Sequence, residues 1–255
     1  MDTKKHFNNL SPIYKTLRTT DEKPVKYISK QLANIPNLKM ADIGCGDGRY
    51  DELLIKRLSN LEILYCVDTN KKMLQSLESY FLGKNISRYK IVNSTAENMP
   101  FEKNSLNTIV SFNALHHFDV VRFLKSADKV LKKGGYIFLY SRTKEQNKKN
   151  IWGRYFPKFN EKEIRLFSSV DIGNIANDIK GIKVQEIREF KYKRCSNLKR
   201  LIFLATNRHY STFNMYSEKE FKESLEIFKK QIKSNFGSEV KWYDFNTLVV
   251  LKKVN

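Results

Sequence analysis

The chain contains the stretch Met40-Ala-Asp-Ile-Gly-Cys-Gly-Asp-Gly-Arg-Tyr50, in which a short apolar run and an acidic residue lead into three glycines at alternate positions. The residues that follow, Asp51-Glu-Leu-Leu-Ile-Lys-Arg-Leu58, have the apolar spacing of a helix. Glycine tolerates a positive φ and lets a ligand approach the backbone without meeting a Cβ atom. The stretch therefore predicts a strand, a glycine turn and a helix that together form the floor of a nucleotide-binding site.

The spacing of these glycines restricts the ligand. A dinucleotide-binding fingerprint reads G-x-G-x-x-G, which would place its third glycine at position 49, where the chain has Arg49. Here the third glycine is Gly48. The turn is therefore not a dinucleotide fingerprint.

The run from Asp42 to Gly48 resembles the first motif of the class I S-adenosylmethionine-dependent methyltransferases, in particular the small-molecule type found in the ubiquinone/menaquinone and biotin pathways. Three later segments resemble further motifs of that family in the same order, namely Asp68-Thr-Asn-Lys-Lys-Met73, Ala96-Glu97 and Ser111-Phe-Asn-Ala-Leu-His-His-Phe118. The resemblance covers about residues 38–141. It implies S-adenosyl-L-methionine as the cofactor.

Strand-like and helix-like segments alternate regularly from position 38 to position 141, which predicts βαβ units and a parallel sheet. We therefore expect an α/β protein with helices on both faces of a Rossmann-like sheet. The resemblance implies seven strands, mostly parallel, with the last strand antiparallel. A helical cap insertion is expected among the C-terminal strands.

This pattern predicts a single methyltransferase domain over residues 1–255. Residues 1–37 are expected to form an N-terminal helical lid, and residues 38–141 the cofactor-binding core. Residues 142–170 and 191–236 are expected to be substrate-side cap elements around the C-terminal strands.

The resemblance assigns contacts with the cofactor to residues that follow the predicted strands. Asp42 can accept from the methionine ammonium or from a bridging water, and Asp68 can accept both ribose hydroxyls. The remaining candidates are Gly44, Cys45 and Gly46 in the turn, Thr69 and Met73 flanking the adenine, Ala96 and Glu97 at the adenine edge, and Asn113 at the methionine end. Each of these residues, taken alone, also has a structural interpretation. An acidic residue after a strand, for example, is often only the cap of the next helix.

Methyl transfer requires alignment of the acceptor with the methyl group and exclusion of water, and it requires a base only when the acceptor arrives protonated. His116 and His117 are the candidates for such a catalytic base, because they follow the predicted fourth strand. The alternative is that this pair only packs or caps the next helix.

Aromatic and guanidinium side chains recur outside the predicted core. They suit an apolar or aromatic acceptor that carries a carboxylate or phosphate, because arginine binds planar anions and rings stack. The candidates are Tyr14 and Arg18 in the lid, then Arg142, Trp152, Arg154, Tyr155, His209 and Tyr210. The alternative is a small aromatic core beneath the cap, and both interpretations can hold together.

Several classes of methyltransferase lack support. The exit of the fourth strand, Asn113-Ala-Leu-His116, is not the Asn/Asp-Pro-Pro-aromatic turn of enzymes that methylate nucleobase amines. No cysteine follows the fourth or fifth strand, as methylation at base C5 requires, and arsenite methyltransferases need several thiols. We therefore favour a small organic acceptor, aromatic or anionic.

Composition leaves two alternatives open. The net charge of +20 allows an RNA or tRNA methyltransferase that uses the basic C-terminal half, although the basic residues are scattered. A protein that binds the cofactor without catalysis is the other alternative.

The three cysteines have no metal-binding spacing, and no apolar run is long enough for a membrane span. A reduced, cytoplasmic protein without a metal is expected, and the sequence makes no prediction of oligomeric state.

Overall fold

The computed structural model describes residues 14–255, without the side chains of Tyr14, Lys15 and Ser169. The first thirteen residues of the predicted lid lie outside the described residues. The chain divides into two compact units. The larger comprises Thr19–Ser141, Ser169–Arg188 and Thr247–Asn255, and the smaller comprises the segment ending at Arg18, Arg142–Ser168 and Glu189–Asn246.

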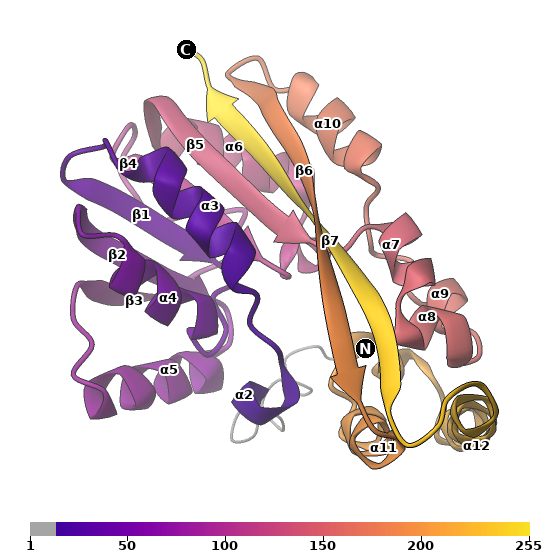
Figure 1. Ribbon diagram of the computed structural model, residues 1–255. Coiled ribbons are helices and arrows are strands. Elements are labelled where there is room, and N and C mark those ends of the chain that lie inside the picture. The colour runs from indigo at the N-terminus through magenta and orange to yellow at the C-terminus, as the bar shows by residue number, and fades with distance from the viewer. Residues whose placement is uncertain (1–13) are drawn as a thin grey trace. The chain divides into compact units, whose positions relative to one another are not determined.

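A seven-stranded sheet has the order β3-β2-β1-β4-β5-β7-β6 (Figure 1). Its first five strands pair in parallel, and β7 pairs antiparallel with β5. The strands are β1 (Leu38–Ile43), β2 (Leu61–Asp68), β3 (Tyr89–Asn93), β4 (Leu106–Phe112), β5 (Leu131–Ser141), β6 (Ile182–Ser196) and β7 (Val240–Lys253). The predicted Rossmann-like sheet with an antiparallel last strand is therefore confirmed.

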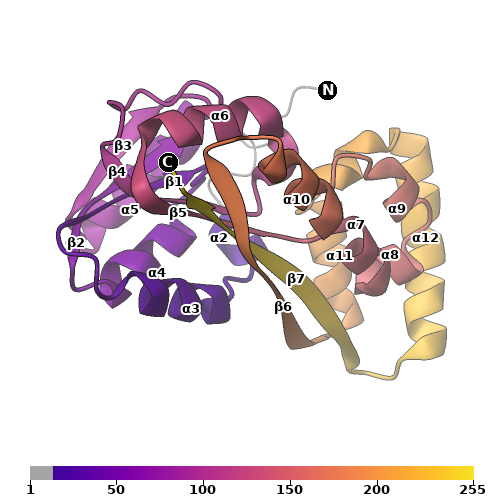
Figure 2. The same cartoon turned by 90° about the horizontal axis from the view of Figure 1, so that it is seen from above.

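Helices cover both faces of the sheet in the larger unit. Figure 2 shows α3 and α4 on one face and α6 and α10 on the other. The helices of this unit are α3 (Glu22–Leu32), α4 (Arg49–Arg57), α5 (Lys71–Gly83), α6 (Val120–Val130) and α10 (Ser169–Asn177), with a short 3-10 helix η2 (Leu115–His117). The central strands β1 and β4 are covered on both faces, so they are buried along most of their length rather than at alternate positions.

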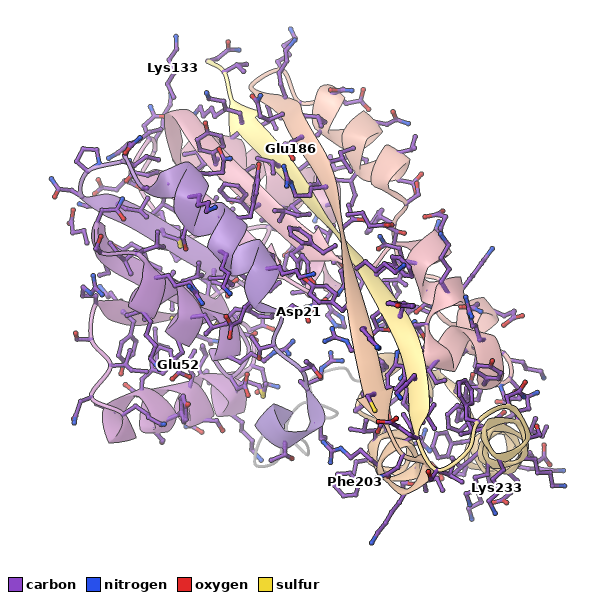
Figure 3. The ribbon with its side chains drawn as sticks, viewed as in Figure 1. Asp21, Glu52, Lys133, Glu186, Phe203 and Lys233 are labelled. Carbon is purple, nitrogen blue, oxygen red and sulfur yellow. The ribbon has the colours of Figure 1, made fainter. Side chains whose placement is uncertain are left out.

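Polar side chains link several elements of the larger unit. Glu52 on α4 accepts a hydrogen bond from the Tyr80 hydroxyl of α5 at 2.8 Å, and Glu186 on β6 accepts one from Tyr27 of α3 (Figure 3). The guanidinium carbon of Arg188 lies 4.5 Å from the centre of the Tyr27 ring. The first contact joins α4 to α5, and the contacts of Tyr27 join α3 to β6, which is distant in the sequence.

The smaller unit is built around an aromatic core. Its helices are α2 (Tyr14–Leu17), α7 (Lys144–Lys149), α8 (Ile151–Tyr155), α9 (Phe159–Lys162), α11 (Leu198–Thr206) and α12 (Glu218–Asn235), with a 3-10 helix η3 (Ser211–Met215). Trp152 stacks on Phe228 of α12 with ring centres 5.0 Å apart, and Phe213 meets the Trp152 ring edge-on at 5.3 Å. Stacked and edge-on rings of this kind add to the energy of apolar burial.

Two strands are longer than the sequence pattern predicts. The stretches that are typical of strands in these two segments are Tyr136–Tyr140 and Lys183–Phe190, whereas β5 begins at Leu131 and β6 continues to Ser196. The residues from Lys191 to Ser196 are rich in lysine and arginine, so they do not resemble a strand in composition. Their exposure nevertheless alternates along β6 with the period of two that a half-buried strand requires.

The glycine turn between β1 and α4 depends on left-handed backbone. Gly44, Gly46 and Gly48 have φ values of 76°, 58° and 76°. A Cβ atom on Gly44 would overlap the Cβ of Ala114, and one on Gly48 would lie 2.7 Å from Cγ of Leu77. A Cβ on Gly46 would meet only the methyl end of Met73, at 3.4 Å. Gly44 and Gly48 are therefore required by conformation and packing, whereas Gly46 has open space beside it.

We predict that Gly44→Ala lowers the free energy of unfolding by about 2 kcal/mol or more, because it adds both left-handed strain and a steric overlap. Urea denaturation measures this change. Gly83→Ala is the matched control, since Gly83 lies in α5 and has no atom within 4 Å of the added Cβ. That variant should be neutral or more stable by up to about 1 kcal/mol. Equal effects of the two substitutions would contradict the account of the turn.

Candidate cofactor-binding site

The carboxyl ends of the parallel strands bring the predicted cofactor residues to one edge of the sheet. Asp42 at the end of β1 pairs in register with Cys66 of β2 on one side and Val110 of β4 on the other. Asp68 is the last residue of β2, and Asn113 directly follows β4. In sheets of this type, ligands bind at the carboxyl ends of the strands.

Three hydrogen bonds fasten the glycine turn to the end of β2. The amides of Gly44 and Cys45 both donate to the carbonyl oxygen of Val67, at 2.8 and 3.1 Å. The amide of Gly46 donates to Oδ2 of Asp68 at 3.0 Å. The turn therefore has one defined position relative to the Asp68 carboxylate.

Each carboxylate oxygen of Asp68 accepts a hydrogen bond from a backbone amide. Its Oδ1 accepts the amide of Asn70 at 2.8 Å, while Oδ2 accepts Gly46. Burial raises the pKa of Asp68 above its usual value, and the amide hydrogen bonds oppose this shift. Each carboxylate oxygen can accept more than one hydrogen bond, so both can still receive a hydroxyl group.

The segment after Asp68 places Met73 beside the turn. Asn70 caps α5, since its Oδ1 accepts from the amides of Lys72 and Met73 at 3.0 and 3.1 Å. Met73 is buried, with its methyl end nearest to Gly46, and Thr69 is exposed. An apolar side chain and an open glycine therefore lie together next to the Asp68 carboxylate.

Asp42 is almost completely buried, with 1% of its surface exposed. Burial raises its pKa well above the usual value, and the nearby carboxylates of Asp51 and Asp68 raise it further. Its Oδ1 atom is buried and accepts no hydrogen bond from a nitrogen or hydroxyl donor of the described residues. The sequence predicts Asp42 as a ligand-binding residue but gives no sign that Asp51, a first-turn helix residue, lies against it.

Glu97 and the two histidines belong to one region beside the turn. Oε1 of Glu97 accepts the amide of Asp119 at 2.9 Å, and Ala96 next to it is buried. His116 and His117 lie on η2, with ring centres 4.0 Å apart. His117 is exposed and His116 is half-buried. The Glu97 side chain thus joins the segment after β3 to the end of the histidine loop.

Asn113 sits in a cluster that sequence reasoning missed. It has a φ of 56°, and its amide donates to the carbonyl of Tyr140 at 2.7 Å. Tyr50 stacks on Phe112 with ring centres 4.1 Å apart, and the Tyr140 hydroxyl donates to Oδ2 of Asp21 at 2.7 Å (Asp21 is labelled in Figure 3). Asp21 directly precedes α3 but its side chain makes no capping hydrogen bond, and its carboxylate instead reaches β5.

The predicted substrate residues fall into two groups in the smaller unit. Arg18 and Arg142 lie over the ring of Tyr210, with guanidinium carbons 4.8 and 5.2 Å from its centre. Arg142 also donates to the Tyr210 hydroxyl at 3.2 Å and lies 3.7 Å from a carboxylate oxygen of Asp244. Beside them, burial lowers the pKa of His209 well below its usual value, and the charge of Arg18 lowers it further.

The second group lies in or near the aromatic core. Trp152 is buried in that core, with the His209 ring 5.0 Å away. Tyr155 meets Phe236 edge-on at 5.5 Å, and Arg154 is exposed. The backbone of Tyr14 is in α2, but its side chain lies outside the description.

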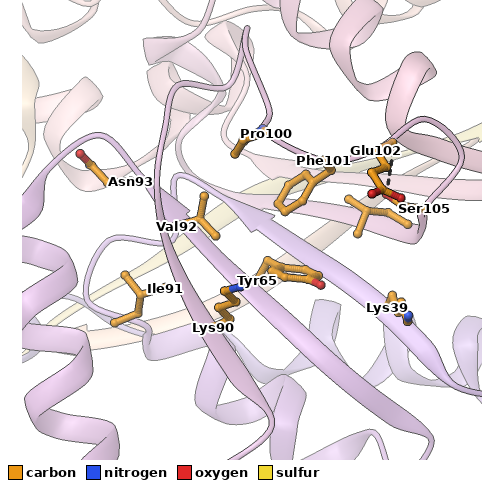
Figure 4. A pocket seen from close by; sticks show the side chains of 11 residues that line it. Lys39, Tyr65, Lys90, Ile91, Val92, Asn93, Pro100, Phe101, Glu102 and Ser105 are labelled. Carbon is orange, nitrogen blue, oxygen red and sulfur yellow. Dashed lines mark hydrogen bonds between the residues drawn. The ribbon is translucent and has the colours of Figure 1, made fainter.

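A pocket of about 610 Å³ lies elsewhere in the larger unit, between β1 to β3 and the segment that follows β3 (Figure 4). Tyr65, Lys90 and Phe101 are among its lining residues, and none of the predicted site residues lines it. The connection from β3 to β4, which supplies part of the lining, contains no helix.

Within residues 14–255, no group of three or more histidine, cysteine or acidic side chains is placed to hold a metal ion. Among the described helices, none combines the length and the apolar character that a membrane span requires.

Residues 41–139 match the family described as the methyltransferase domain. This match spans the glycine turn, Asp68, Glu97 and the histidine loop. This segment is similar to methyltransferase domains, which agrees with the resemblance of its motifs to the S-adenosylmethionine-dependent class. The cofactor that this similarity implies is S-adenosylmethionine.

Curated relatives are similar to part of this chain. An uncharacterized protein of Methanocaldococcus jannaschii, MJ1252, is 33% identical over 101 residues, which are 39% of this chain and 35% of that protein. The uncharacterized methyltransferase YcgJ of Bacillus subtilis is 32% identical over 74 residues, 29% of each chain. The chain thus aligns with about a third of the length of these relatives.

Solved structures share the fold over a longer range. The crystal structure of YcgJ has a TM-score of 0.65 and 17% identity, covering 92% of this chain and all of that one. Geranyl diphosphate methyltransferase in complex with GPP and sinefungin has a TM-score of 0.57 and 13% identity, covering 90% of this chain and 76% of that one. The methyltransferase fold therefore extends beyond residues 41–139.

The residues at the turn fit S-adenosylmethionine. The ribose offers two hydroxyl donors for the oxygens of Asp68, and Gly46 leaves open space beside them. The buried Oδ1 of Asp42 lacks a nitrogen or hydroxyl donor, as expected next to an ammonium or a water molecule bound to it. Asp68, Gly46 and Asp42 are the residues that would hold the cofactor.

We predict that Asp68→Asn weakens binding of S-adenosylhomocysteine roughly 10- to 100-fold, because the ribose loses charge-assisted hydrogen bonds. Isothermal titration calorimetry measures the dissociation constant. Glu62→Gln is the control, since Glu62 is an exposed carboxylate on the same strand that pairs with Lys39. An Asp68→Asn dissociation constant equal to that of the control would refute the ribose assignment.

Proposed function

We propose that this chain is an enzyme that transfers the methyl group of S-adenosylmethionine to a small organic acceptor with an aromatic or anionic part. The observation that carries the proposal is the arrangement in the smaller unit, where the guanidinium groups of Arg18 and Arg142 both lie over the ring of Tyr210. Planar cations recognise carboxylates and phosphates, and they also stack on rings. We assign these three residues to acceptor recognition.

One neighbour supplies a precedent for such an acceptor. Geranyl diphosphate methyltransferase was solved with GPP, an acceptor that is small, apolar along its chain and anionic at one end. The shared fold supports the proposal that a methyltransferase of this architecture acts on a small anionic molecule.

The cofactor supplies a methyl group that is already activated as a sulfonium. The chain must then orient the acceptor, exclude water and, where the acceptor is protonated, remove a proton. His117 is the candidate base, because it is exposed on η2, whereas His116 is half-buried beside it. Arg18, Arg142 and Tyr210 would bind the acceptor, and Asp68 and Asp42 the cofactor.

The RNA alternative rests on the basic C-terminal half, and part of that charge is neutralised locally. Arg194 pairs with Asp244 at 3.2 Å, and Lys162 pairs with Glu220 at 3.0 Å. Arg165 pairs with Glu163 at 2.5 Å.

A cytoplasmic location stays a prediction from the use of cysteine. The thiols of Cys45, Cys66 and Cys195 are free, as in a protein of a reducing compartment, and this supports the prediction.

We predict that a panel of small phenols, carboxylates and phosphorylated compounds contains acceptors that stimulate release of S-adenosylhomocysteine. Mixed tRNA should not stimulate release, and its binding should collapse as salt rises, as non-specific binding does. Product release measures the first effect and fluorescence anisotropy the second. Salt-resistant tRNA binding with methylation would favour the RNA alternative, and no turnover with any acceptor would favour the non-catalytic one.

We predict that His117→Ala lowers turnover with the acceptor so identified by about 100-fold or more, as removal of a general base does. The dissociation constant for S-adenosylhomocysteine should change by no more than about twofold. Steady-state kinetics and calorimetry measure these quantities. His116→Ala is the matched control, and turnover that is unaltered in His117→Ala would assign the pair to packing.

A further inference from the structure

Two buried carboxyl groups meet beneath the glycine turn. Asp42 and Cys66 are register partners on adjacent parallel strands, so their side chains project from the same face of the sheet. Asp51, in the first turn of α4, lies against that face, and its carboxyl is within hydrogen-bonding reach of both the Asp42 carboxyl and the Cys66 thiol. Asp51 has none of its surface exposed, and Asp42 has 1%.

These carboxyl groups lack the donors that ionised carboxylates require. Oδ1 of Asp42 and both carboxylate oxygens of Asp51 are buried and accept no hydrogen bond from a nitrogen or hydroxyl group in the described part of the chain. Two adjacent buried carboxylates also repel each other. One proton shared between them removes a charge and supplies a hydrogen bond at the same time.

The surrounding groups favour a protonated pair. Burial raises the pKa of Asp51 to about 7, and its hydrogen bonds to Asp42 and Cys66 only partly oppose this. The carboxylates of Asp47 and Asp68 raise the pKa of Asp51 further, whereas the positive charge of Arg49 lowers the pKa of Asp42. Burial raises the pKa of the Cys66 thiol well above its usual value, so the thiol stays neutral at physiological pH.

We propose that Asp51 is a positioning residue for the cofactor: its carboxyl shares one proton with Asp42 in the free protein, and the pair loses that proton to solvent when the ammonium group of the cofactor binds. The positive charge of the ammonium group then compensates the negative charge that remains on the two carboxylates after the proton leaves. This inference rests on the cofactor of the proposed function and not on its acceptor. The Asp51 side chain is thus both a support for Asp42 and the source of a pH dependence.

The direction of that dependence follows from linkage. The free pair holds a proton below its raised pKa, and the complex with a cation holds fewer protons. Affinity therefore falls as pH drops below about 7, by at most about tenfold per pH unit for one proton. Above the raised pKa the pair is already ionised, and affinity stops changing.

Binding of two ligands to the wild-type protein tests this without an acceptor. S-adenosylhomocysteine carries the ammonium group, whereas methylthioadenosine has the same adenine and ribose without the amino acid. Calorimetry from about pH 5.5 to 7.5, in buffers of different ionisation enthalpy, should show release of up to about one proton for the first ligand. The second should release none beyond the contribution of Asp68, which both ligands share.

The Asp51→Asn variant separates the pair from the nearby histidines, because it retains His116 and His117. Its affinity for S-adenosylhomocysteine should lose the pH slope, while Glu52→Gln on the same helix should keep it. Equal slopes for the two ligands, or an unchanged slope in Asp51→Asn, would overturn the proposal alone. No binding of S-adenosylhomocysteine at any pH would overturn it together with the cofactor assignment. If Asp51→Asn does not fold, the comparison of ligands on the wild-type protein still decides.

Discussion

The hydrogen bond from the Gly46 amide to the Asp68 carboxylate, 3.0 Å long, is the interaction on which the site depends. It acts with the two amide bonds to the Val67 carbonyl, so the turn after β1 is attached to the end of β2. A loop of three left-handed glycines has many conformations when unattached, because glycine restricts φ so little. These bonds select one conformation, in which the open side of Gly46 and the free acceptor capacity of Asp68 lie together.

Beneath this turn two carboxyl groups are buried next to each other, which is unfavourable for the stability of the fold. Asp42 and Asp51 are buried carboxyl groups, and burial of a carboxylate without donors costs stability. Buried ionisable groups with perturbed pKa values often mark functional sites, although structural networks produce them too. We assign this pair a role in the site because it lies directly under the glycine turn, in the segment that is similar to methyltransferase domains.

Local sequence pattern was sufficient for much of the fold. The glycine turn, the alternation of strands and helices and the acid at the end of β2 all depend on residues near each other in the chain. The extension of β6 past Phe190 could not be predicted from local pattern. Its residues from Lys191 to Ser196 are largely charged, and they form a strand only because they pair with a distant segment of the chain.

The same limit applies to the site. Asp51 is an acid in the first turn of α4, where a negative charge favours the helix dipole, and Asp21 directly precedes α3, where acids often cap a helix. In the structure Asp51 is buried against Asp42, and Asp21 accepts the Tyr140 hydroxyl. The sequence allows Trp152 to belong either to a pocket wall or to an aromatic core. In the structure its ring packs in the core against Phe213 and Phe228, which follow more than sixty residues later in the chain. These outcomes depend on tertiary neighbours, which the spacing of residues along the chain does not reveal.

The most direct test of the account is a crystal structure of the protein with S-adenosylhomocysteine. The account predicts both ribose hydroxyls on the carboxylate of Asp68, the nucleoside beside Gly46 and Met73, and the amino group next to Asp42, directly or through one water. Electron density for the nucleoside away from the turn, for example in the pocket lined by Tyr65 and Phe101, would contradict it.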